Sequence, residues 1–238
     1  MINTLNESSL HRTLKTYYAS MSEGSRTEVK TDDYIADIID KKGNITEIQT
    51  ANLAYLKDKI KYFTAEKRNI SVIYPIVTTK YIETVNQKTG KTVYRKSPQH
   101  KTIYSIFREL TGLYPFLLNK YFSLEAVEVI TVEIRKTTEE PVQSINGRRR
   151  VRRNWLKTDK QLKEIGKIHK FHSREHYLSL LPKNLPECFT ATDIRKAFAE
   201  QNLKIKTNDI QLMLWVFSHC GLLEKKECGK RRYNYRIK

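Results

Sequence analysis

Two carboxylates in neighbouring short apolar runs are the residues of this chain whose type and spacing suit chemistry. In "YIADIIDKKGNITEIQT" (34–50), Asp37 lies in the middle of one run and Glu47 in the middle of the next. A carboxylate on a strand that should pack or pair is costly unless something compensates. If the strand register lets them converge, the pair suits Mg²⁺, which prefers oxygen ligands, polarises a phosphodiester and lowers the pKa of bound water. In the alternative interpretation, both acids merely face water.

The residue two positions after Glu47 belongs to the same candidate site. Side chains alternate along a strand, so Glu47 and Gln49 point to one side and Ile48 to the other. A neutral amide orients water or ligates through its carbonyl oxygen. It brings no positive charge to stabilise a nucleophile or a developing phosphorane. We therefore expect Gln49 to position water.

The elements that must hold these residues follow from the apolar periodicity. Asn52 is a plausible N-cap for the helix that follows the strands. The apolar run at 70–77 is typical of a strand buried on both faces. Period and turn signals predict a helix over 3–20, strands at 27–30, 34–39 and 45–50, a helix over 53–68 and a strand at 70–77. The order α-β-β-β-α-β predicts a sheet with at least one helical crossover.

The second half of the chain continues the sheet and then changes character. We expect a hairpin over 80–96 with its turn near Thr89-Gly90, an amphipathic helix over 101–118, a strand over 123–136 and a partly helical segment over 159–180. Pro182 and Pro186 mark a boundary. Beyond it the pattern predicts helices at 189–201 and 207–221 and two strands around Gly229. Helix, helix and hairpin are typical of a winged helix.

The charge of the chain is strongly basic and unevenly placed. The net charge is +18; residues 1–90 hold 13 Lys and Arg against 11 Asp and Glu, and residues 91–238 hold 31 against 15. Such a balance favours a polyanion as partner, most simply a nucleic acid, over a merely basic protein or a membrane-surface binder. No run of 18 apolar residues and no signal-peptide pattern occurs, so we expect a cytoplasmic protein with no membrane partner.

Two basic segments are candidate nucleic-acid contacts, because arginine forks and clustered lysines bind phosphates. The face of the second C-terminal helix that carries Trp215 is poorly basic, so we expect it to pack on the other domain or on a partner. The candidates are Arg148, Arg149, Arg150, Arg152 and Arg153 in "GRRRVRRNW", and Lys225, Lys226, Lys230, Arg231 and Arg232 in the hairpin.

Asp37, followed by Glu47-Ile48-Gln49 on the next strand and preceded by Glu7 on the first helix, resembles the PD-(D/E)XK nuclease superfamily. The resemblance covers about residues 3–77. It implies a restriction-endonuclease-like fold, metal ligation by Asp37 and Glu47, assistance by Glu7 and a possible homodimer. Gln49 departs from the lysine that the family most often has there. The chain also resembles an uncharacterised prokaryotic family that joins such a core to a winged helix, which implies no activity.

The combined prediction is an α/β (α+β) chain with a mixed sheet flanked by helices. Its domains are a nuclease-like domain at 1–155, a helical connector at 156–186 and a winged-helix domain at 187–238. The predicted function is metal-dependent DNA endonuclease activity with Mg²⁺, or Mn²⁺ in its place. Two alternatives stay open: a catalytically inactive nuclease-like DNA-binding or regulatory protein, and a module that contacts RNA or a ribonucleoprotein.

Overall fold

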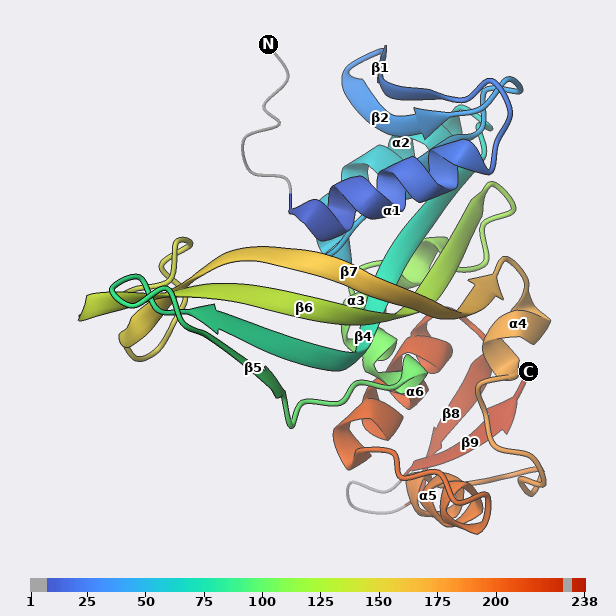
Figure 1. Ribbon diagram of the computed structural model, residues 1–238. Coiled ribbons are helices and arrows are strands. Elements are labelled where there is room, and N and C mark those ends of the chain that lie inside the picture. Colours follow the sequence, from blue (N-terminus) through green and yellow to red (C-terminus); the bar gives the residue numbers. More distant parts are fainter. Residues whose placement is uncertain (1–7, 229–232) are drawn as a thin grey trace.

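A seven-stranded mixed sheet forms the centre of the computed structural model, which describes residues 8–228 and 233–238 (Figure 1). The strand order is β1-β2-β3-β4-β6-β7, and β5 pairs with β4 off this path. The strands are β1 (Arg26–Thr31), β2 (Tyr34–Ile39), β3 (Ile45–Ile48), β4 (Ile70–Val85), β5 (Thr92–Lys96), β6 (Phe122–Val142) and β7 (Arg153–Phe171). The protein is therefore mixed α+β with a large mixed sheet flanked by helices.

Helical crossovers explain the two parallel pairings of the sheet. β3 with β4 and β4 with β6 are parallel, and the other neighbours are antiparallel. Parallel neighbours need a crossover between them. The first crossover consists of η2 (Leu53–Leu56) and α2 (Lys57–Ala65), and Asn52 caps η2 as predicted. The second consists of η3 (Ile103–Ile106), α3 (Phe107–Leu110) and η4 (Tyr114–Phe116).

One helix covers the first face of the sheet. The helix α1 (Ser9–Ser20) begins at Ser8, whose hydroxyl accepts a hydrogen bond from the His11 amide. Leu10 and Leu14 of α1 are fully buried against sheet residues that include Ile38 and Ile48. Figure 1 shows α1 in front of the sheet, above β6 and β7 in that view. The predicted N-terminal helix is thus confirmed for its described part.

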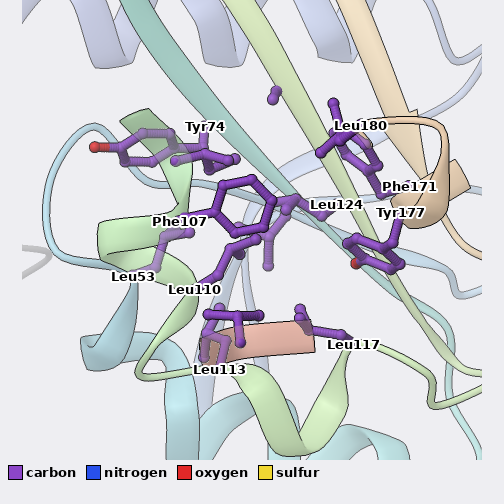
Figure 2. Close-up of a cluster of buried hydrophobic side chains, with 14 of the residues drawn as sticks. Leu53, Tyr74, Phe107, Leu110, Leu113, Leu117, Leu124, Phe171, Tyr177 and Leu180 are labelled. Atoms are coloured by element: carbon purple, nitrogen blue, oxygen red, sulfur yellow. The ribbon is translucent and has the colours of Figure 1, made fainter. Parts of the chain in front are cut away.

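The second face carries the larger core. Figure 2 shows Tyr74 of β4, Leu124 of β6 and Phe171 of β7 beside side chains from η2, α3 and the short helix α4 (Arg174–Leu178). Tyr177 of α4 stacks on Phe171 with ring centroids 5.2 Å apart. Burial of such apolar area is the main stabilising contribution to the fold.

The C-terminal segment shares this second core. It consists of α5 (Ala191–Glu200), α6 (Thr207–His219), β8 (Leu223–Glu227) and β9 (Tyr233–Ile237). The Thr190 hydroxyl caps α5 by accepting a hydrogen bond from the Asp193 amide. Phe217 of α6 packs edge-on against Phe107 of α3, with centroids 5.2 Å apart. The two helices and two strands are confirmed; Gly229, the predicted turn, lies outside the described residues.

The continuous helix predicted over 101–118 is wrong. The apolar residues Ile103, Ile106 and Leu110 are buried as expected, but the backbone is divided into η3, α3 and η4. A Cβ at Gly112 would lie 2.9 Å from the Cβ of Ala54, so this glycine lets the two crossovers approach closely. Pro115, inside η4, cannot donate the backbone hydrogen bond that a longer helix needs.

The helical connector predicted at 156–186 is wrong over its first half. Residues 156–171 belong to β7, which pairs with β6 along its length, and the helical part of the segment is α4. Leu162, Ile165 and Ile168 recur every three residues, which is typical of a helix. Each of two register shifts places one extra β7 residue between successive members of this set. The bulges therefore turn all three toward the α1 face.

The described helices and the three cysteines bear on membrane insertion and on disulfide bonding. No helix within residues 8–228 and 233–238 is long and apolar enough to cross a membrane. Cys188, Cys220 and Cys228 are free thiols.

Candidate functional site

Asp37 and Glu47 lie opposite one another where β2 and β3 separate. Backbone pairing ends at Ile38 and Thr46, and the next residues on the two strands are Asp37 and Glu47. The Asp37 amide donates to Oε1 of Glu47 at 3.2 Å, and the Ile48 amide donates to Oδ2 of Asp37 at 2.8 Å. The two carboxylates thus replace ladder hydrogen bonds, and each satisfies the backbone beside the other.

A lysine from α2 completes this pair. The Lys59 ammonium lies 2.6 Å from Oε2 of Glu47 and donates to the Ile35 carbonyl at 2.5 Å. Both side chains of the ion pair are almost buried, Lys59 at 11% and Glu47 at 5% exposed. The sequence placed Lys59 off the apolar stripe of its helix and assigned it no role. The sign of its role in the sequence is its position. Lys59 lies on the crossover helix directly after β3, and this helix returns along the sheet.

A histidine from α1 approaches the other acid. Nε2 of His11 lies 3.5 Å from Oδ2 of Asp37, and both side chains are about one-fifth exposed. The first turn of α1 carries His11, so the helix that covers the sheet also reaches the candidate site. Sequence reasoning missed His11, because one histidine on an amphipathic helix gives no signal without the tertiary fold.

The two carboxyl groups are driven toward different protonation states. Burial raises the pKa of Glu47 to about 7, the charge of Asp37 adds to this, and Lys59 opposes it. Burial alone would raise the pKa of Asp37, but hydrogen bonds from His11 and the Ile48 amide hold it below its ordinary value. Paired acids with separated pKa values are typical of sites that handle protons and cations.

The raised pKa of Glu47 predicts a specific pH dependence of stability. The carboxyl is protonated in both folded and unfolded chains below about pH 4.5, so its penalty appears only as pH rises toward about 7. Across that interval we expect the free energy of unfolding of the wild type to fall by on the order of 2–3 kcal/mol relative to that of Glu47→Gln. Urea unfolding of both proteins at several pH values measures it. A constant difference between them would contradict the burial of a titrating Glu47. The lowered pKa of Asp37 has the opposite effect on stability. Its ionised carboxylate stabilises the fold, and this stabilisation is lost as the pH falls through the acidic range.

The other predicted site residues are Gln49 and Glu7. The Gln49 side chain donates to the Asn52 carbonyl at 3.1 Å and so holds the turn after β3. Glu7 lies outside the described residues. Within the described part of the chain, no group of three or more His, Cys, Asp or Glu side chains is arranged to hold a metal ion. Asp37 and Glu47 offer oxygen ligands of the kind that Mg²⁺ prefers, and Glu47 is paired with the Lys59 ammonium.

The arginine run lies in the loop between β6 and β7, and its last member, Arg153, begins β7. Arg149 donates to the carbonyls of Val142 and Trp155, at 3.3 and 3.1 Å. Arg148 donates to the Tyr55 hydroxyl at 3.5 Å, which links the loop to the segment after β3. The exposed members of the run are Arg148, Arg150, Arg152 and Arg153. The run therefore presents exposed guanidinium groups beside that of Arg149, which two backbone carbonyls hold in place.

The C-terminal basic residues lie on and beyond β8. Lys225 and Lys226 are exposed; Lys225 lies over the Tyr233 ring at 3.7 Å, and Lys226 pairs with Glu224 at 3.5 Å. Trp215 on α6 meets Tyr114 of η4 edge-on at 5.3 Å, so this helix face partly packs on the rest of the chain. Lys230, Arg231 and Arg232 lie outside the described residues.

Comparison with known proteins gives the class and then the family. The chain is an α+β protein whose large mixed sheet carries the acidic pair, and residues 8–172 match a family model described as "Domain of unknown function (DUF8091)". The chain belongs to this family. An uncharacterized protein of Treponema pallidum (strain Nichols) is 32% identical over 197 residues, which is 81% of this chain and 73% of that protein. No solved structure matches the chain. The matched region includes the whole sheet and ends just after β7.

Proposed function

We propose that the protein is a Mg²⁺-dependent DNA endonuclease with a restriction-endonuclease-like domain. The observation that carries the proposal is the convergence of Asp37 and Glu47 at the gap between β2 and β3, with Lys59 against Glu47. Buried carboxylates and a buried ammonium are costly to place together, because each loses its hydration. Hydrolysis of a phosphodiester, which uses such charged groups together, would explain why they lie at the point where β2 and β3 separate.

The arrangement of the elements supports the same class of fold. α1 packs on the β2–β3 unit, and the crossover through α2 returns to the parallel strand β4. This is the order that the resemblance to the PD-(D/E)XK superfamily implies. The C-terminal α5, α6 and β8–β9 hairpin fit a winged helix, with Phe189 bridging to Tyr235 beside the hairpin.

Each residue of the site has a distinct task in this proposal. Asp37 and Glu47 would hold Mg²⁺, or Mn²⁺ in its place, which would polarise the scissile phosphate and acidify a bound water. Lys59 supplies the positive charge that Gln49 cannot, and binds a non-bridging phosphate oxygen. Glu47 gives up its proton near neutral pH. His11 keeps Asp37 ionised and oriented.

DNA is the proposed substrate because the chain is strongly basic, with a net charge of +18, and part of this charge lies in the loop that reaches Tyr55. The excess lies in residues 91–238, which include the arginine loop and the basic hairpin. Arg148 contacts Tyr55, which follows the acidic strand β3 closely in the sequence. Exposed arginines at this place bind the phosphate backbone through paired hydrogen bonds.

A cleavage assay tests the proposal. Supercoiled plasmid is incubated with Mg²⁺, Mn²⁺ or EDTA and either wild type or Glu47→Ala, with Glu164→Ala on the exposed surface of β7 as the matched control. We expect metal-dependent nicking by wild type and by the control, and a loss of at least about 100-fold in Glu47→Ala. Cleavage that persists in Glu47→Ala would place the chemistry elsewhere or in a contaminant.

The inactive, DNA-binding alternative also has an observation in its favour. The Lys59 ammonium already neutralises Glu47, and the Gln49 amide donates to the Asn52 carbonyl. These groups of the site are therefore paired without a metal ion or a substrate. Retained DNA binding without cleavage under any metal condition would favour this function. Competition among duplex DNA, single strands and structured RNA separates it from an RNA-binding module, and sedimentation tests the proposed homodimer.

A further inference from the structure

A cavity of about 720 Å³ opens beside the start of α1 and is bordered by β4, β6, β7 and the loop that carries the arginine run. Five of its thirteen lining residues are cationic, two are acidic, and few are apolar. The cationic lining residues are Lys80, Arg135, Arg149, Lys157 and Lys160. A hollow with so many positive charges concentrates anions.

The acids in this cavity are already engaged by their neighbours. Glu133 is buried and pairs with Lys80 at 3.2 Å and with Arg135 through Nε at 2.7 Å. Asp159 accepts hydrogen bonds from the amide and hydroxyl of Ser9, at 3.1 and 2.5 Å. The carboxylate of Asp159 thus caps the first turn of α1, and the helix end contributes no free anion site. The two acids leave the other cations of the cavity uncompensated.

The surroundings of Lys160 disfavour its protonated form. Burial lowers its pKa to about 8, and the neighbouring Lys157, Lys101 and Lys80 add to this, opposed only in part by Glu133. Among the described residues, no carboxylate forms an ion pair with Lys160. Like charges gathered in a partly dry cavity destabilise the fold unless an anion joins them.

An indole ring fixes two guanidinium groups at the same cavity. Arg135 and Arg149 both lie against Trp155, at 3.5 and 4.0 Å from the ring centroid. Arg149 is also held by the carbonyls of Val142 and Trp155. Guanidinium groups fixed in this way lose little freedom on binding, and their planar forks match phosphate oxygens.

The cavity lies close to the acidic pair. Ser8 lines the cavity, and His11, about one helical turn further along α1, contacts Asp37. On the other side, Arg148 of the same loop reaches Tyr55, shortly after β3. A strand bound in the cavity is therefore led toward Asp37 and Glu47.

We infer that this cavity binds a backbone phosphate of the nucleic-acid strand that enters the Asp37–Glu47 site. The inference rests on the proposed function for the identity of the strand. A polymer fits better than a small free anion, because the exposed Arg150, Arg152 and Arg153 extend the positive surface beyond the cavity. Lys160 and the Arg149 guanidinium supply the phosphate contacts, because Glu133 already engages the Arg135 guanidinium.

Oligonucleotide binding in EDTA tests the inference without requiring cleavage. A short fluorescein-labelled DNA strand is titrated with wild type, Lys160→Met and Lys167→Met, the last removing an exposed lysine of the same strand β7. We expect Lys160→Met to bind about tenfold more weakly, with a salt dependence smaller by about one phosphate contact. Lys167→Met should bind nearly as wild type. Lys160→Met should also melt at a higher temperature without DNA, which shows that it folds.

The outcomes separate this inference from the nuclease proposal. Wild-type affinity in Lys160→Met overturns the phosphate site, even if plasmid cleavage is observed. Weakened binding in Lys160→Met supports the site, even if no metal condition gives cleavage. Inorganic tripolyphosphate is the second probe: if it raises the melting temperature through Lys160 but does not compete with the oligonucleotide, the cavity binds small anions and the assignment to a nucleic-acid strand is wrong.

Discussion

Lys59→Met is expected to destabilise the protein by about 3 kcal/mol at about pH 8.5 and by much less at about pH 6. The reason is that Glu47 is buried and loses the cation that lies 2.6 Å from its carboxylate. Without Lys59, the influence that lowers the pKa of Glu47 disappears, so this pKa rises above its present value of about 7. At the lower pH the carboxyl is protonated and needs no partner. Urea unfolding at the two pH values measures the difference.

Two further variants make this result specific. Lys61→Met removes an exposed lysine of the same helix and should change stability by less than about 0.5 kcal/mol. Adding Glu47→Gln to Lys59→Met should restore most of the loss at high pH, since no charge is then stranded. Equal destabilisation at both pH values would mean that Lys59 contributes packing rather than charge. The same variant also tests catalysis, because plasmid cleavage should fall by about 100-fold or more.

Phe107→Ala is expected to cost about 4 kcal/mol, because the ring is fully buried between the sheet and α6. The ring is among the side chains drawn in Figure 2, and its partner Phe217 lies on α6. Because this contact joins the C-terminal segment to the sheet, the loss should appear in a single unfolding transition. Leu118→Ala, at a position that is 43% exposed, is the matched control and should cost far less.

The two tryptophans allow the transition to be observed at both ends of the molecule. Trp155 lies on β7 and Trp215 on α6, so Trp155→Phe and Trp215→Phe each leave one probe. Coincident urea transitions from the two proteins, both shifted by Phe107→Ala, would show one cooperative unit. Separate midpoints for the two probes would show that α5, α6 and the β8–β9 hairpin unfold independently of the sheet.

The elements with a clear local signal were predictable from the sequence. The strands at 34–39 and 45–50, the Asn52 cap and the buried run at 70–77 each had period, turn or cap residues that agree with the fold. β7 was not predictable, because its bulges give Leu162, Ile165 and Ile168 a helical spacing on an extended backbone. Local pattern cannot show a bulge that exists only against a partner strand.

The site was predictable only where it is local in sequence. Asp37 and Glu47 are ten residues apart on adjacent strands, and their spacing showed them. Lys59 and His11 come from helices on opposite faces of the sheet, and only the tertiary fold brings each to its acid. The cavity at Lys160 was not predictable for the same reason, because the residues that surround it come from five separate segments of the chain.

The position of β7 has a consequence for self-association. β7 is the last strand of the described sheet and leaves one row of backbone groups without a neighbouring strand. Such an edge invites a second chain to add its own strand, with aggregation as the outcome. β7 carries five lysines (Lys157, Lys160, Lys163, Lys167 and Lys170) against Asp159 and Glu164. Antiparallel addition of a second copy in a register centred on this strand would bring these lysines opposite one another. The charges that we propose for nucleic-acid binding therefore also disfavour extension of the long edge into a continuous sheet.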